Sequence, residues 1–132
     1  MKRSRSIFVS LILSILVGLF LVISGVLLIW CQQAADILFD MHGINTFEND
    51  PLTMAMGIRQ LCIGLMIVSL AFLRQTKALG IIMVIGAFVP LVDFISFIPK
   101  IGLISAMRHG GTIPVVLGVG IFLLTRKVMD KN

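Results

Sequence analysis

The sequence predicts an all-α fold, an integral membrane four-helix bundle with a short interfacial helix in its first outer loop. Hydrophobic residues make up 58% of the 132 residues, and charged residues only 13%, about half the roughly 25% of a soluble domain. One small core cannot enclose so many apolar side chains. Four apolar stretches follow one another, and none alternates with the period of two that a membrane barrel requires. The composition also excludes disorder, and the length favours a single domain over residues 1–132.

The first helix is expected over residues 7–30, which contain no charge. A helix needs roughly 20 apolar residues to cross a bilayer. A signal peptide is the alternative, but this stretch exceeds the usual apolar region of about 7–15 residues and has no small-residue cleavage site. Bulky Trp30 before Cys31 argues against a lipoprotein. We therefore expect this helix in the mature protein.

The loop from Cys31 to Pro51 is acidic and is the one sizeable polar segment. Apolar residues recur in it at helical spacing up to Ile44, which predicts a short helix on the outer membrane surface. A simple solvated connector is the alternative. A connector would not need apolar residues, so we favour the interfacial helix.

Three further helices complete the expected bundle. The apolar run 113–125 is too short alone and is extended back to Ser105, which brings Arg108 and His109 into its outer part. The other two helices carry a charge deeper within the span, Arg59 and Asp93. The expected spans are residues 52–73, 78–98 and 105–125.

Basic residues indicate the orientation. With an even number of spans both termini lie on one side, and that side collects most of the Lys and Arg residues. Only Lys100 and Arg108 fall on the other side. The positive-inside rule then places the termini in the cytoplasm. The net charge of +5 is thus a topology signal, and we expect no nucleic-acid partner because no basic stripe lies on a soluble face.

Arg59 and Asp93 are the most informative residues of the sequence. A charge in mid-membrane costs roughly 2.5–3.5 kcal/mol on insertion scales, so it usually faces the bundle interior and finds a partner. A rise of 1.5 Å per residue puts Arg59 about 10 Å and Asp93 about 8 Å below the outer surface. We therefore expect the two charges to meet between neighbouring helices.

Other polar residues converge on the same level. Gly86, Pro90 and Asp93 share one helix face, and Pro90 frees a backbone carbonyl in the preceding turn. We expect a small outward-facing polar cavity between the last three helices. Its function could be a structural salt bridge or a site for a ligand, proton or substrate, and the sequence leaves both open. The expected site residues are Arg59, Gln60, Asp93, Ser96 and His109.

Small residues predict close helix packing. Gly18 and Gly25 are seven residues apart in the first helix, and Gly57 and Gly64 repeat this spacing in the second. Packing within the chain is favoured over a homodimer seam. Gly110 and its neighbour Gly111 predict a loop or a close-packing point. No C-x-x-C pair or catalytic triad is visible. His42 and His109 have acidic neighbours that could bind a metal, but we interpret them as polar surface residues, so no cofactor and no metal are expected.

The second helix carries a motif that resembles a small four-span membrane family, the domain of unknown function 4267, which is similar to the DoxX-like tetraspan proteins. The resemblance covers most of the chain and rests on the Gly57-x-Arg59 run, on Pro90-x-x-Asp93 and on His109. The sequence departs from the family in carrying Gln60 where an acidic residue is frequent. The family implies no established activity, and the remoter DoxX proteins imply only an association with quinone-linked redox complexes.

The expected function is non-enzymatic. We expect a multi-pass protein of the cytoplasmic membrane, in contact with the lipid bilayer, that binds a small hydrophobic or lipid-like ligand, or a membrane protein partner, through the cavity. One alternative is a small transporter, dimeric or not, that uses Asp93. The other is a membrane enzyme acting on a lipid or quinone, for which the sequence shows no catalytic geometry.

Overall fold

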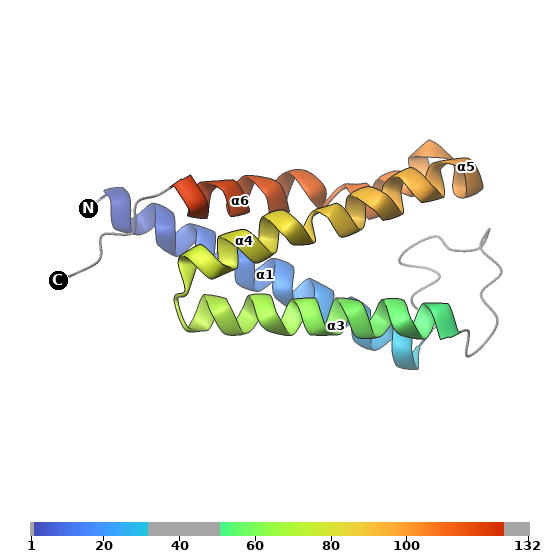
Figure 1. Cartoon of the computed structure of the whole chain (residues 1–132), viewed down its shortest axis with the longest axis horizontal. Coiled ribbons are helices and arrows are strands. Elements are labelled where there is room, and N and C mark those ends of the chain that lie inside the picture. The colour runs from blue at the N-terminus through green and yellow to red at the C-terminus, as the bar shows by residue number, and fades with distance from the viewer. Residues whose placement is uncertain (1, 32–50, 126–132) are drawn as a thin grey trace.

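The computed structural model describes residues 2–31 and 51–125, and every regular element in these two ranges is a helix (Figure 1). The predicted all-α fold is confirmed. The interfacial helix expected before Ile44 lies outside the described residues. The helices are α1 (Lys2–Trp30), α3 (Pro51–Phe72), α4 (Thr76–Gly86), α5 (Phe88–Gly110) and α6 (Ile113–Thr125).

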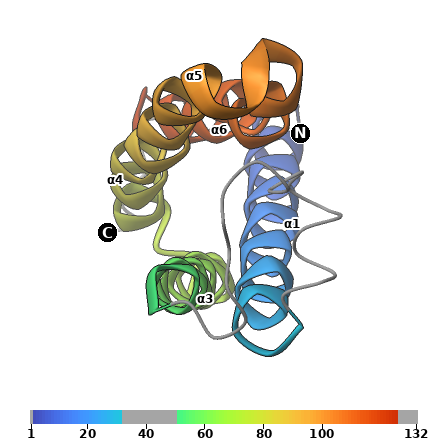
Figure 2. The ribbon, with the colours of Figure 1, turned by 90° about the vertical axis from the view of Figure 1, so that its right-hand side faces the viewer.

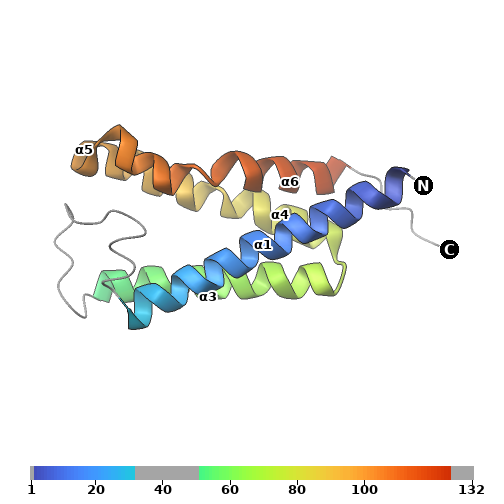
Figure 3. The same cartoon turned by 180° about the vertical axis from the view of Figure 1, so that it is seen from behind.

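Helices α1 and α3 form an antiparallel pair held by backbone contacts at glycines. A Cβ atom added at Gly64 would lie 2.7 Å from the carbonyl oxygen of Gly18, and one at Gly25 would lie 2.7 Å from that of Gly57. Only glycine lets two helices approach so closely in lipid. The seven-residue spacing thus serves packing within the chain, as predicted. Figure 3 shows α1 passing from α3 at its Trp30 end toward α6 at its beginning.

A tight turn joins α3 to α4. Arg74 has a φ of 54°, a left-handed conformation. Its amide donates to the carbonyl of Ala71, and the amide of Gln75 donates to that of Leu70. This pair of bonds is the Schellman motif that commonly ends a helix. The turn brings α4 back antiparallel to α3 (Figure 1).

Helices α4 and α5 continue one another across Ala87. The interruption falls where Pro90, which has no amide hydrogen, cannot donate to the carbonyl of Gly86. Helical hydrogen bonds resume on both sides, since Ala87 donates to Met83 and Leu91 donates to Ala87. The expected helix over 78–98 therefore lies within this longer, slightly broken rod.

Gly102 reverses the chain inside α5. Its φ of 82° and ψ of 163° are non-helical, and they divide α5 into two helical segments. The second segment returns along the first, because a Cβ atom at Gly110 would lie 2.8 Å from the Phe94 ring. The helix expected over 105–125 is thus divided: 103–110 belongs to α5, and α6 begins at Ile113 after a turn at Gly111. Gly110 and Gly111 therefore provide both features that the sequence predicts, a close-packing point and a turn.

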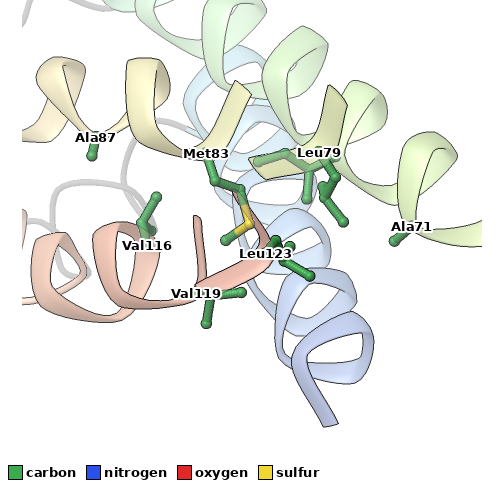
Figure 4. Packing of buried hydrophobic residues seen from close by; sticks show 8 residues of the cluster. Ala71, Leu79, Met83, Ala87, Val116, Val119 and Leu123 are labelled. Carbon is green, nitrogen blue, oxygen red and sulfur yellow. The ribbon is translucent and has the colours of Figure 1, made fainter. Parts of the chain in front are cut away.

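The molecule consists of two helical hairpins packed side by side (Figure 2). One is α1 with α3. In the other, α4 and the first part of α5 pack against the returning segment and α6, again through glycine, since a Cβ atom at Gly80 would lie 3.1 Å from the carbonyl oxygen of Gly120. The core lies between the hairpins near the α3–α4 turn (Figure 4). Its buried residues are Ile67, Ala71, Leu79, Met83, Ala87, Val116, Val119 and Leu123.

The outer surface of the bundle is strongly apolar. Large hydrophobic side chains such as Phe8, Ile23 and Ile104 are exposed on several helices. Three helical stretches are long and apolar enough to cross a membrane, Ser6–Trp30, Thr53–Phe72 and Thr76–Met107, the last including the break at Gly102; the apolar helix Ile113–Thr125 is shorter. Exposed apolar surface on this scale is typical of a protein embedded in a lipid bilayer.

Candidate functional site

The two charges within the helices form an ion pair that joins the hairpins. Nη2 of Arg59 on α3 lies 3.3 Å from Oδ2 of Asp93 on α5 and donates a hydrogen bond to it. The predicted contact is confirmed. The side chains remain 40% and 21% exposed, respectively. Nε of Arg59 is buried and has no acceptor among the described residues.

Gln60 makes the next polar contact along α3. Ser24 of α1 donates from its hydroxyl to Oε1 of Gln60 at 2.6 Å. This bond fixes the orientation of the amide group. The two N–H groups on the amide nitrogen can still act as hydrogen-bond donors. Gln60 and the ion pair therefore lie in succession on α3 and connect it to α1 on one side and to α5 on the other.

A cavity of about 350 Å³ lies between the hairpins. All four helical rods contribute to its lining, α1 included, which differs from the cavity expected between the last three helices. Gly86, Pro90 and Asp93 line it together, as their shared helix face predicts. Most of the lining is apolar, and only part of it has the polar character that the sequence predicts. The apolar lining comes from Leu13, Leu16, Val17, Phe20, Leu21, Ile63, Ile67, Ile82, Met83, Val89, Val115 and Val116.

The polar groups of the cavity gather at one end. Gln60, Asp93 and Thr112 line it there, whereas Met83 and Ile67 also belong to the core cluster at the other end. Ten residues of helix separate Met83 from Asp93, a rise of about 15 Å. The cavity is therefore an elongated pocket with an apolar floor and a polar end.

The cavity opens sideways between α1 and α6. On that side its lining residues are themselves exposed: Leu16 by 57%, Phe20 by 41% and Val115 by 46%. On the opposite side Met83 and Ile67 are buried. The open side of the cavity therefore lies on the exposed apolar surface of the bundle.

Not every expected site residue belongs to the cavity. Arg59 and Ser96 are not among its lining residues, and Ser96 is exposed on α5. His109 lies near the end of α5, and its side chain is outside the part that the structure describes. Within the described residues no three His, Cys, Asp or Glu side chains lie close enough together to hold a metal ion.

Sequence reasoning overlooked two polar groups of this site, Ser24 and Thr112. Ser24 directly precedes Gly25, which contacts Gly57 in α3, three residues before Gln60. Antiparallel pairing of the two glycine series could have placed Ser24 opposite Gln60. Thr112 follows Gly111 in the turn between α5 and α6. The Gly110–Gly111 pair predicts a turn there, but the sequence reasoning assigned no site residue to it.

Apolar helices with exposed hydrophobic surfaces and a charged pair between them define a helical integral membrane protein. The chain belongs to the family of the domain of unknown function DUF4267, whose sequence model matches residues 18–123. No curated protein and no solved structure matches the chain significantly. The matched range includes both residues of the ion pair, Arg59 and Asp93, and most of the residues that line the cavity.

Proposed function

We propose that this protein is a four-span protein of the cytoplasmic membrane that binds a lipid-like ligand in the cavity between its two hairpins. The observation that carries the proposal is the form of the cavity. It is apolar over most of its length, has a polar end at Asp93 and Gln60, and is bordered by exposed apolar side chains of α1 and α6. Pockets of about 300–1,000 Å³ with mostly apolar walls and few polar groups are typical ligand sites.

The arrangement of the helix ends supports four spans with both termini in the cytoplasm. The beginning of α1, the end of α6 and the α3–α4 turn lie at the same end of the bundle (Figure 1). Exposed Arg74 and Lys77 belong to that turn and the start of α4. Trp30, which is 73% exposed, lies at the opposite end of α1, where an aromatic ring favours the membrane interface.

The experiment places a fluorescent reporter in the cavity. Leu13→Trp, combined with Trp30→Phe, leaves one tryptophan, at an exposed rim position near the apolar end. The protein in lipid nanodiscs is then titrated with 12-bromododecyl chains that end in a hydroxyl, a carboxylate or a trimethylammonium group. Bromine quenches tryptophan on contact, so a chain bound in the cavity lowers the fluorescence.

Two glycines supply matched variants. A Cβ atom at Gly86 meets no atom within 4 Å, and Gly86 lines the cavity; Gly118 is equally unobstructed but does not line it. We expect Gly86→Leu to fill the cavity and abolish saturable quenching, while Gly118→Leu leaves it intact. If no probe distinguishes the two variants, the chains lie only in the bilayer and the proposal is wrong.

A further inference from the structure

The dimensions of the cavity indicate the shape of its ligand, an inference that rests on the proposed function. We infer that the cavity holds one linear hydrocarbon chain of about a dozen carbon atoms, extended along α4 and α5, and excludes fused rings and paired chains. The length, the volume and the lining of the cavity support this shape, and none of them concerns the head group.

Three of the helical rods give the length of the cavity. Its lining extends from position 13 to 21 on α1 and from 60 to 67 on α3, rises of about 12 Å and about 10 Å along the helix axes. On α4 and α5 it extends from position 83 to 93, a rise of about 15 Å. The cavity is therefore roughly 10–15 Å long. A dozen carbon atoms joined by zigzag single bonds of about 1.5 Å span about 14 Å, which is within this range.

The volume of the cavity fits a single chain of that length. A volume of about 350 Å³ holds roughly a dozen groups of about 30 Å³ each. Divided by the length, it gives a mean cross-section of about 23–35 Å². A chain that adds one such group for about every 1.3 Å fills about 23 Å², and two chains side by side need about twice that area. The four fused rings of a sterol alone contain more carbon atoms than the cavity has room for.

The lining of the cavity also suits a flexible chain. Leucine, isoleucine and valine side chains form most of it. Flat ring systems gain from stacking on aromatic side chains, which the described lining offers only at Phe20. Close-packed side chains resist widening. A ring with the same number of carbon atoms is shorter and wider than the extended chain, so it does not fit the same space.

Gly86 keeps the two ends of the cavity continuous. It lies three residues after Met83 and seven before Asp93, and a Cβ atom there meets nothing within 4 Å. A leucine side chain would place four carbon atoms at this point, about a third of the groups that the cavity holds. In a cavity one chain wide, such a side chain blocks the passage. Gly86→Leu should therefore abolish the binding of a chain that extends past it.

The first test compares 2-bromododecan-1-ol with 2-bromocyclododecan-1-ol, which differ only in ring closure. Leu13→Trp and Phe20→Trp, each combined with Trp30→Phe, place single reporters about 10 Å apart on α1. Binding is the quenching that Gly86→Leu removes and Gly118→Leu retains. We expect the linear alcohol to have a Kd at least about tenfold lower, because the wider ring must displace packed side chains.

The outcomes separate the ligand shape from the proposed function. Equal affinity of the cyclic alcohol would show that the inferred shape is wrong, while the proposed function stands. If neither alcohol shows quenching sensitive to Gly86→Leu with either reporter, the inference is wrong, and the proposed function then depends on the acid and ammonium probes.

The single chain can come from a free amphiphile or from one acyl chain of a bilayer lipid that enters from the side. Nanodiscs of phosphatidylcholine brominated on one acyl chain distinguish these sources. Quenching that Gly86→Leu reduces relative to Gly118→Leu assigns the chain to the bilayer lipid. Equal quenching of the two variants in these discs, together with binding of the linear alcohol, assigns it to a free amphiphile. Both results support one linear chain in the cavity.

A second test determines whether the chain extends along the cavity. Bromine lies at opposite ends of 2-bromododecan-1-ol and 12-bromododecan-1-ol. One probe should therefore quench the reporter at position 13 more strongly, and the other probe the reporter at position 20. If both probes quench the same reporter more strongly, the chain does not lie along the cavity and the inference is wrong.

Discussion

Nη2 of Arg59 lies 3.3 Å from Oδ2 of Asp93, and this contact connects the hairpin of α1 and α3 to the hairpin that begins with α4. The same carboxylate lines the cavity between the hairpins. One side chain thus belongs both to the packing of the bundle and to its candidate ligand site. Its structural role and its proposed role in ligand binding can be tested separately, because stability and binding are measured in different experiments.

The ion pair should show strong coupling in a double-mutant cycle. Arg59→Gln leaves the Asp93 carboxylate without its cationic partner, and Asp93→Asn leaves the guanidinium without its anionic partner, so each alone should destabilise. The double variant should lose less stability than the sum of the losses in the two single variants. Unfolding in SDS should give a coupling energy of about 0.5–3 kcal/mol. Additive effects would show that the contact contributes nothing to the stability of the bundle.

Gly64→Ala should force α1 and α3 apart. The new Cβ atom would lie 2.7 Å from the carbonyl oxygen of Gly18 and 2.8 Å from the amide nitrogen of Val22, and backbone atoms cannot move aside separately. We expect a loss of about 1–3 kcal/mol in the same SDS assay. Gly118→Ala, with nothing within 4 Å, is the control and should be neutral or stabilising by up to about 1 kcal/mol. Equal stability of the two variants would contradict the glycine contact.

Gly102→Ala tests the reversal inside α5. Its φ of 82° and ψ of 163° suit glycine alone, while a Cβ atom there would meet nothing within 4 Å. Any loss of stability in the alanine variant therefore comes from backbone strain, and we expect it to be on the order of 1–3 kcal/mol. Far-UV circular dichroism alongside SDS unfolding shows whether helix content is kept. An alanine variant as stable as the parent would mean that the chain does not turn at Gly102.

Cysteine labelling tests the proposed orientation. Cys31 and Cys62 are free and exposed, so Cys62→Ala leaves Cys31 as a single target after α1. A second protein, with both cysteines replaced and Gln75→Cys added, reports on the α3–α4 turn. In intact bacterial cells an impermeant maleimide should label Cys31, and should label the cysteine at position 75 only after permeabilisation. The reverse pattern would invert the topology.

The sequence was sufficient for the helical class, the Arg59–Asp93 contact and the glycine packing. All three follow from local rules: apolar length, the cost of an unpaired charge in lipid, and the close approach that glycine permits. The reversal at Gly102 was not predicted, because a lone glycine between apolar residues is also compatible with a continuous helix. For this reason the sequence predicted one continuous helix from Ser105 to Thr125, which the structure divides between α5 and α6.

The chemistry of the cavity could not be inferred from residue pattern alone. Polar residues on a helix face predict where a polar group lies, but a cavity exists where side chains fail to fill space. Gly86 and the crossing of α1 leave that space, and both depend on how the hairpins pack. Sequence reasoning therefore found Gln60 and Asp93 but omitted the apolar wall from α1.

The most direct measurement of the central claim, that the space between the hairpins is a ligand site, is a quenching titration with 12-bromododecan-1-ol. It compares Leu13→Trp/Trp30→Phe protein carrying Gly86→Leu with the same protein carrying Gly118→Leu. The structure predicts a saturating curve for Gly118→Leu and only a gradual, non-saturating decline for Gly86→Leu. Superimposable curves from two equally well folded variants would contradict the claim.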